Sequence, residues 1–257
     1  MRGTLFTEMY AGRDLLIYLP PSYDKASYPL PVVYVHDGGD VFDLVLNGTL
    51  YNLEQRFAAG TLPELILVGI AAYDPLVEYT PWYARALYPG LGHGDFGGRA
   101  TEYLNMIVHE IKPWIDQHFY TDDRPEMTGI VGKSLGGLVS LFAAYVYPHV
   151  FGRIGLMSAS LWYEGFIEFM RERQHLSSDL RIYMDLGNLE GVGKANRQRL
   201  IQTCTDEAVD ILLNNIPASH FYFERIKGDD HDPETFYQRF PDLMGWLFDK
   251  KTVGLLK

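Results

Sequence analysis

The chain has 257 residues, of which 47% are apolar and 21% are charged, and its formal net charge is −11. These apolar and charged fractions are close to those of globular domains, which excludes an intrinsically disordered protein. The excess of acidic residues argues against nucleic acid as a partner, since binding to phosphates requires clustered Lys and Arg. We expect one domain spanning residues 1–257, because single α/β domains commonly reach this length.

Two features of the sequence bear on the compartment. Cys204 is the only cysteine, which excludes an internal disulfide and fits a reducing environment. The first ten residues contain no apolar segment behind a basic start, and no run of about 18 apolar residues occurs in the chain. We therefore expect a cytoplasmic protein with no membrane anchor.

The predicted strands begin with residues 4–10 and 14–19, whose apolar and polar residues alternate, as in an antiparallel pair. Further along, short apolar runs without alternation recur, and most are followed by a longer stretch with helical periodicity. The runs are residues 32–35, 65–70, 128–131, 153–157, 180–184 and 221–226. This pattern predicts an α/β fold with a mostly parallel sheet that carries helices on both faces.

Helices are predicted between these strands from apolar residues spaced three and four apart. They cover residues 100–119, 135–147 and 196–215, and a last helix begins after Asp232, which is followed by a proline in the first turn. Residues 73–98 are rich in Tyr, Pro and Gly and predict a long loop over one end of the sheet. Long ordered loops in compact domains are often functional.

A candidate nucleophile lies between the strand at 128–131 and the helix at 135–147. The motif is G-x-S-x-G, formed here by Gly132-Lys133-Ser134-Leu135-Gly136. It requires a sharp strand-to-helix turn that exposes the serine hydroxyl, and the flanking elements predict that turn. A phosphate-binding G-x-x-x-x-G-K-S loop is the alternative, but Met127 occupies the position of its first glycine.

A serine hydroxyl needs an imidazole to accept its proton and a carboxylate to orient that imidazole. In this arrangement the chain order is Ser, acid, His, and His231 is the histidine that follows the last predicted strand in a polar turn. We therefore predict that His231 is the base. The other downstream histidines are interpreted as structural or solvated, namely His149, His175 and His220.

Two carboxylates follow the strand at residues 180–184 and are candidates for the acid. Asp185 lies at the edge of the strand, and Glu190 reaches further toward the carboxyl end of the sheet. Spacing alone leaves both open.

Two backbone amides are expected to stabilise the oxyanion of an acyl-transfer intermediate. One is that of Leu135, directly after the nucleophile, and the other is assigned to Gly39 in the loop after residues 32–35. His36 and Asp37 in the same loop suggest a metal site, but no H-E-x-x-H or other His/carboxylate cluster accompanies them. No metal is therefore predicted.

Several further motifs occur in the order found in one family. They are residues 34–39, 78–82, 97–100, 110–115, 132–137, 147–152 and 158–163. With them the chain resembles the putative-esterase branch of the α/β-hydrolases, which includes siderophore trilactone (enterochelin) esterases, S-formylglutathione hydrolases, feruloyl esterases and mycolyltransferases. The resemblance extends over most of the chain and implies the α/β-hydrolase fold with an eight-stranded, mostly parallel sheet.

The resemblance also implies which acid acts, because it places that residue several positions past the D-x-G element of the seventh strand. That position is Glu190, with Asp185 as the alternative. Two departures from the family stand out. Lys133 is unusual before the nucleophile, and the arginine that relatives often place before the Tyr-Thr-Pro element is absent, so that Arg85 or Arg99 would have to replace it.

Together these observations predict a serine carboxylic ester hydrolase that acts through an acyl-enzyme without any cofactor. Its partner would be a small-molecule ester, with a siderophore trilactone or an aryl ester as candidates. Tyr73, Trp82 and Trp162 are expected to wall the pocket, although plain core packing is the alternative for such aromatics. An acyltransferase with the same triad, or a non-catalytic binding protein of the same fold, are the alternative functions.

Overall fold

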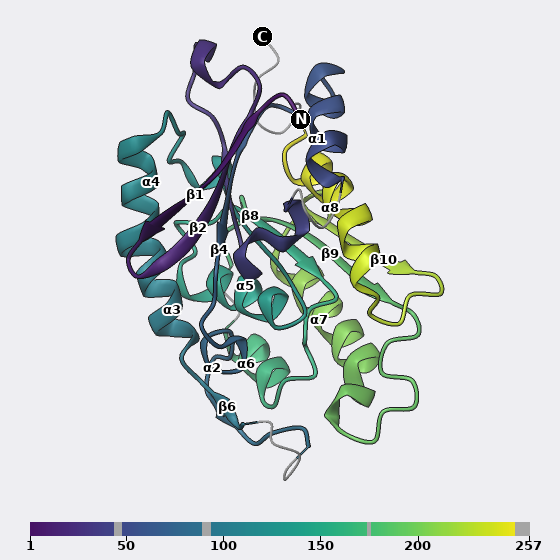
Figure 1. The fold of residues 1–257 in the computed structure, drawn as a ribbon. Coiled ribbons are helices and arrows are strands. Elements are labelled where there is room, and N and C mark those ends of the chain that lie inside the picture. Colours follow the sequence, from purple (N-terminus) through teal and green to yellow (C-terminus); the bar gives the residue numbers. More distant parts are fainter. Residues whose placement is uncertain (44–47, 89–93, 174–175, 250–257) are drawn as a thin grey trace.

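A computed structural model describes residues 1–43, 48–88, 94–173 and 176–249 of the chain. Its centre is an eight-stranded sheet with the order β1-β2-β4-β3-β7-β8-β9-β10, in which β1 and β2 are antiparallel to each other, β2 is antiparallel to β4, and all later pairs are parallel (Figure 1). The strands are β1 (Thr4–Tyr10), β2 (Arg13–Leu19), β3 (Val32–Val35), β4 (Ile66–Ile70), β7 (Thr128–Lys133), β8 (Arg153–Met157), β9 (Arg181–Gly187) and β10 (Phe221–Ile226). The predicted α/β fold and its mostly parallel sheet are confirmed.

Strand β3 shows why apolar and polar residues do not alternate in the central strands. Val32 and Tyr34 pack on one face of the sheet, and Val33 and Val35 pack on the other, with all four side chains buried. Successive side chains of a strand point to opposite faces, so a strand covered on both sides needs apolar residues at every position. The continuous apolar run is therefore the sequence of a central strand.

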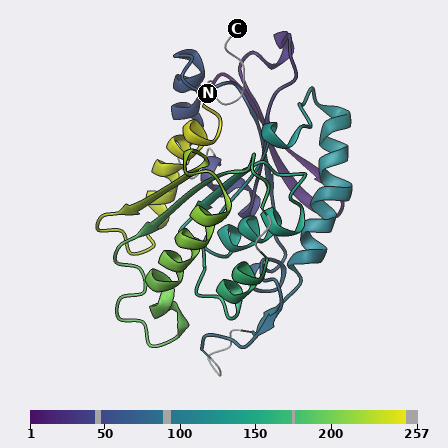
Figure 2. The ribbon, with the colours of Figure 1, turned by 180° about the vertical axis from the view of Figure 1, so that it is seen from behind.

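Helices cover both faces of this sheet. Helices α1 and α8 contribute to the core on one face, and α3 to α7 contribute to the core on the other, where α5, α6 and α7 lie in front of the sheet in Figure 2. The helices are α1 (Thr49–Ala58), α2 (Pro75–Glu78), α3 (Ala100–Met106), α4 (Lys112–His118), α5 (Leu135–Val146), α6 (Phe166–Glu172), α7 (Ile201–Asn215) and α8 (Pro233–Leu247). Short 3₁₀ helices cover Tyr23–Lys25, Pro125–Met127, Arg197–Leu200 and Ala218–His220, and the 3₁₀ segment Asp37–Phe42 is interrupted at Gly38 and Gly39.

The stretch predicted as one helix at residues 100–119 is helical from Ala100 to His118, but it contains a wider turn. Between α3 and α4 the segment Ile107–Ile111 is a π-helix, in which the amide of Lys112 donates to the carbonyl of Ile107. Pro113 follows directly, and a proline has no amide to donate and its ring clashes with the carbonyl four residues earlier. The wider turn accommodates the proline while the apolar side stays on the core.

Helix α8 begins as its sequence predicts. The Asp232 side chain accepts a hydrogen bond from the amide of Glu234 at 3.0 Å, and Pro233 occupies the first turn. An aspartate cap satisfies an amide that has no partner inside the helix, which fixes where the helix begins. The start of α8 in turn sets the length of the loop after β10.

The predicted long loop at residues 73–98 contains α2 and a two-stranded ribbon of β5 (Tyr83–Ala84) and β6 (Phe96–Gly97). Residues 89–93 of this segment lie outside the described residues. In the described part of the chain, no helix is both long enough and apolar enough to span a lipid bilayer.

Candidate active site

Ser134 stands on the turn between β7 and α5, with backbone angles of φ 53° and ψ −120°. A positive φ is unfavourable for a residue other than glycine, and at this position it lifts the side chain out of the sheet. The turn depends on neighbouring glycines. A Cβ on Gly132 would lie 2.4 Å from the carbonyl carbon of Gly136, and one on Gly137 would lie 2.8 Å from the Cβ of Ala159.

The hydroxyl and the backbone around Ser134 have defined partners. Its Oγ lies 3.2 Å from Oγ of Ser160, and the amide of Ser160 donates to the Ser134 carbonyl at 2.9 Å. Leu135 is the first residue of α5, where helical geometry offers its amide no carbonyl partner. That amide can therefore donate to an oxygen bound at Ser134.

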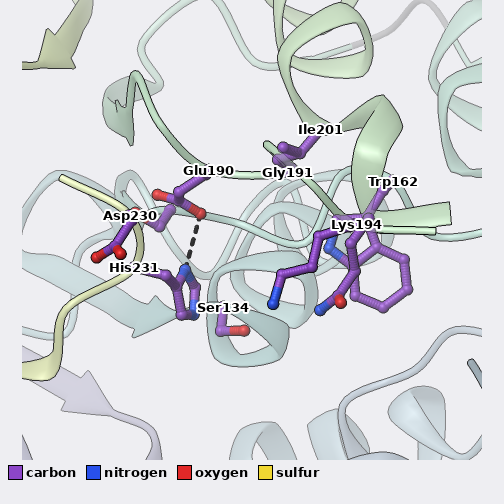
Figure 3. Close-up of a pocket in the computed structure, with 10 residues that line it drawn as sticks. Ser134, Trp162, Glu190, Gly191, Lys194, Ile201, Asp230 and His231 are labelled. Atoms are coloured by element: carbon purple, nitrogen blue, oxygen red, sulfur yellow. Dashed lines mark hydrogen bonds and ion pairs between the residues drawn. The ribbon is translucent and has the colours of Figure 1, made fainter. Parts of the chain in front are cut away.

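His231 and Glu190 meet beside Ser134, although they come from different loops (Figure 3). Glu190 follows β9, His231 lies between β10 and α8, and the Nδ1 of His231 is 2.8 Å from Oε2 of Glu190. The other carboxylate oxygen accepts the amide of Gly187 at 2.9 Å. The side chain of Glu190 is 6% exposed, so its carboxylate is held by these partners rather than by solvent.

Asp185, the other carboxylate that the spacing left open, faces elsewhere. It is buried inside β9, accepts the amide of Ser158 at 3.1 Å, and pairs with Nη1 of Arg239 at 3.1 Å. Burial raises the pKa of this carboxyl to about 7, although the charge of Arg239 opposes the shift. The structure thus places Glu190, and not Asp185, against the imidazole of His231.

The loop that carries His231 is braced by a pair that sequence reasoning missed. Asp229 is buried, and its Oδ1 accepts the amides of His231 at 3.1 Å and of Asp232 at 3.0 Å. Its Oδ2 pairs with Nη2 of Arg239 at 3.2 Å. His231 itself has a φ of 84°, an unusual conformation that the Asp229 hydrogen bonds support. An aspartate two residues before the histidine was the available signal, but its partner lies on α8.

The structure does not support the predicted role of Gly39. Gly39 has a φ of 75°, and its amide donates to the carbonyl of His36 at 3.1 Å, so this amide is already used within the loop. A Cβ at this position would lie 2.5 Å from the ring of Phe42. Glycine is therefore required here by the turn, which is a structural reason for the Gly38-Gly39 pair.

The unusual Lys133 before the nucleophile has a clear structural role. Its Nζ lies 3.0 Å from Oδ2 of Asp37 and 2.9 Å from Oδ2 of Asp40, both in the loop after β3. The amide of Asp37 donates to Oη of the buried Tyr79 at 2.9 Å. Lys133 and Tyr79 therefore tie the loop after β3 to the nucleophile turn and to the Tyr-Thr-Pro segment.

His36 and His220 are engaged elsewhere, and His149 is exposed. Nδ1 of His36 is 2.8 Å from Oη of Tyr103, and burial lowers the pKa of His36 to about 4, which keeps the ring neutral. His220 contacts the carbonyl of Ser178 at 3.0 Å. His175 lies outside the described residues.

An open cavity contains Ser134, His231 and Glu190 (Figure 3). Its other lining residues are Ser158, Trp162, Gly191, Lys194, Gln198, Ile201 and Asp230. The cavity lies at the carboxyl ends of β7, β9 and β10, where ligands bind in open parallel sheets. One aromatic residue of the predicted pocket wall, Trp162, is among its lining residues.

The other two predicted wall residues lie outside this cavity. Tyr73 is 74% exposed, and its hydroxyl donates to the carbonyl of Gly12 in the β1–β2 turn. Trp82 donates through Nε1 to the carbonyl of Glu164 at 2.7 Å and packs against Phe166. Neither residue is among the lining residues of this cavity, and Trp82 has the aromatic neighbours that the packing alternative expects.

Comparison with known proteins agrees with this architecture. The family model described as "Putative esterase" matches residues 7–247. The chain is 34% identical over 256 residues to the uncharacterized protein YbbA of Bacillus subtilis, which covers 99% of this chain and all of that protein. It is 26% identical over 154 residues to a siderophore enterobactin esterase of Emericella nidulans, covering 55% of this chain and 50% of that one.

Among solved structures, an IroE-like serine hydrolase from Shewanella oneidensis superposes with a TM-score of 0.80 at 21% identity. The match covers 95% of this chain and 80% of the other. This likeness establishes the α/β-hydrolase fold.

Proposed function

The chain belongs to the putative esterase family and is a carboxylic ester hydrolase, and we propose that Ser134, His231 and Glu190 form its catalytic triad. The observation that carries the proposal is the 2.8 Å contact between Nδ1 of His231 and Glu190, in the cavity that also contains Ser134. These residues come from three separate loops at the same edge of the sheet. Nucleophile, base and orienting acid are the groups that acyl transfer to a serine requires.

In the proposed reaction the Ser134 hydroxyl turns from Ser160 toward Nε2 of His231 and attacks the ester carbonyl. His231 accepts the hydroxyl proton, and Glu190 stabilises the imidazolium through Nδ1–H. The amide of Leu135 donates to the oxyanion. His231 then returns its proton to the leaving alcohol, and a water molecule, deprotonated by the same imidazole, releases the acid from the acyl-enzyme. No cofactor takes part.

The burial of Glu190 supports this assignment of roles. Its carboxylate keeps two partners, the imidazole of His231 and the amide of Gly187, and is otherwise shielded from water. Opposite charges interact more strongly where water is excluded, so the imidazolium that forms during the reaction is stabilised there. The serine hydroxyl, by contrast, faces the open cavity, where a substrate can reach it.

The proposed substrate is a small ester, with an aryl ester or a siderophore trilactone as the leading candidates. The relative from Emericella nidulans is described as a siderophore enterobactin esterase, and Trp162 offers an aromatic surface in the cavity. Neither Arg85 nor Arg99, the cationic replacements for the missing family arginine, lines the cavity. Arg99 pairs with Glu102 at 2.7 Å, away from the cavity lining. We therefore rank aryl esters above a multiply charged trilactone.

Labelling with a fluorophosphonate tests the function directly. We expect one adduct on the peptide that contains Ser134 and turnover of para-nitrophenyl esters, both lost in Ser134→Ala. Ser178→Ala, at an exposed position distant from the triad, is the matched control and should keep both. The melting temperature of each variant shows that it is folded. A folded wild-type protein that forms no adduct at Ser134 would remove the proposed mechanism.

A further inference from the structure

The acidic and the basic side chains that line the cavity lie on opposite sides of Ser134 (Figure 3). Glu190 and Asp230 lie on the side of His231, whereas Lys194 and Trp162 lie on the opposite side of the serine. The Lys194 side chain extends into the cavity, with its amino group directed toward Ser134. The cavity thus has an acidic side and a cationic side.

Lys194 is available to a ligand, unlike the other cations near the site. Among the residues that the structure describes, its amino group has no ion-pair partner. Lys133 is engaged by two carboxylates, and Arg197 lies 3.9 Å from Glu164. The backbone holds Lys194 in place through a turn, in which its amide donates to the carbonyl of Gly191 at 3.2 Å.

A second observation at the same cavity also points to a ligand. Ser158 lines the cavity and is 1% exposed, yet its hydroxyl has no hydrogen-bond partner in the described structure. A buried polar group without a partner is costly, and such groups in native proteins usually have a functional or solvent partner. The backbone of Ser158 is fixed by Asp185, so the hydroxyl is held in this position.

The position of His231 decides which half of an ester lies near Lys194. The leaving alcohol must accept the proton of His231, so it lies on the side of that residue. The acyl half then extends to the other side of Ser134, toward Lys194 and Trp162. A carboxylate on the acyl group would pair with Lys194 there, and the Ser158 hydroxyl would provide a donor in the same cavity.

Resting on the function proposed above, we propose that Lys194 selects acyl groups that carry a carboxylate, so that the enzyme prefers half-esters of dicarboxylic acids. The chain as a whole has a net charge of −11, which repels anions. A preference for an anionic substrate therefore requires a local cation, and Lys194 is placed to provide it.

Two matched substrates test the proposal: the mono-para-nitrophenyl ester of adipic acid and para-nitrophenyl hexanoate. They share chain length and leaving group and differ in the terminal carboxylate. We expect a higher kcat/KM for the adipate ester in the wild-type protein. In Lys194→Met the ratio of the two values should fall about twofold to fivefold, as for an exposed ion pair. Lys194→Arg should restore most of the ratio.

The matched control is Lys25→Met, which removes an exposed lysine that does not line the cavity and should leave the ratio at the wild-type value. Ser158→Ala should lower the ratio in the same direction as Lys194→Met, by a smaller factor. Ser134→Ala gives the uncatalysed background for each substrate.

The outcomes separate this proposal from the one it rests on. Turnover of hexanoate with a ratio that Lys194→Met leaves unchanged overturns the role of Lys194 and leaves the triad intact. Turnover of neither ester, together with no fluorophosphonate adduct, overturns the triad itself. If Lys194→Met instead changes the preference for 4-acetoxybenzoate over phenyl acetate, the carboxylate is recognised in the alcohol half, and the acyl assignment is wrong.

Discussion

Asp185 and Glu190 are two carboxylates at the end of one strand, and their surroundings differ more than their burial. Asp185 is 1% exposed and Glu190 is 6% exposed. Asp185 faces Arg239 of α8, whereas Glu190 faces His231 in the cavity. Burial of an acid therefore does not identify a catalytic group. The residue that pairs with each carboxylate distinguishes the two acids.

The side chains of Asp185 and Glu190 point in different directions because one residue lies inside β9 and the other lies beyond it. Asp185 is inside β9, so the pleat fixes its side chain against one face of the sheet. Glu190 lies beyond the strand in a turn that continues through Gly191, whose φ is 81°. This turn brings the Glu190 carboxylate back to the amide of Gly187 and toward His231. The strand thus holds a structural acid, and the loop after it holds the proposed catalytic one.

The largest expected effect comes from neutralising each acid in turn. Glu190→Gln should lower kcat about a hundredfold to ten-thousandfold, because the imidazolium loses its counter-charge and the tautomer of His231 is no longer fixed. Asp185→Asn should change kcat less than about threefold, since this side chain does not contact the imidazole. Steady-state kinetics with para-nitrophenyl hexanoate measure both.

The same pair of variants contains its own control, since each changes one carboxyl to an amide of similar shape. Both should still react with the fluorophosphonate, Glu190→Gln more slowly. A larger loss of kcat in Asp185→Asn would reverse the comparison and assign the catalytic acid to the strand.

A smaller effect, on stability, is expected from removing the positive charge of Arg239, the partner of Asp185. Arg239→Met leaves Asp229 and Asp185 without the guanidinium that pairs with both. Leaving a buried carboxylate unpaired should lower the free energy of unfolding by about 3 kcal/mol. Urea denaturation followed by tryptophan fluorescence measures this change.

Arg239→Lys is the control, because it keeps the charge but not the fork that reaches two carboxylates. It should lie between the wild type and Arg239→Met. Activity per folded molecule should fall less in Arg239→Met than in Glu190→Gln, because Asp229 acts on His231 only through the backbone. Unchanged stability in Arg239→Met would show that the two aspartates do not depend on this cation.

This contrast also shows what the sequence can predict. Strands such as β3 and β8 were predicted to the residue, because burial on both faces requires a continuous apolar run. The elbow at Ser134 was predictable because the glycines, the strand before it and the helix after it are local in sequence. The fold follows from such local patterns once they are combined.

Contacts between distant segments could not be predicted in the same way. The ion pair between Asp229 and Arg239 on α8 braces the His231 loop, and no sequence pattern at either residue predicts this contact. Gly39 was assigned a donor role because a flexible glycine pair follows β3, but its amide turns inward to His36. Tyr73 likewise lies outside the cavity lining, because its hydroxyl contacts the carbonyl of Gly12 in the β1–β2 turn.

The smallest expected effect concerns the titration of Asp185. Burial raises the pKa of this carboxyl from 3.8 to about 7 in the folded protein. Between about pH 4 and pH 7 the folded state therefore holds a proton that the unfolded state has released. The contribution of this group to stability is complete below about pH 4 and is lost as the pH rises toward 7, at up to about 1.4 kcal/mol per pH unit.

Asp185→Asn cannot titrate, so it should lack this part of the pH dependence. The free energy of unfolding of the wild type minus that of the variant should decrease as the pH rises from about 4 to 7 and then level off. Urea denaturation at several pH values measures this difference, in which the other carboxyl groups largely cancel. A difference that stays constant with pH would mean that Asp185 is ionised throughout, with the charge of Arg239 outweighing burial.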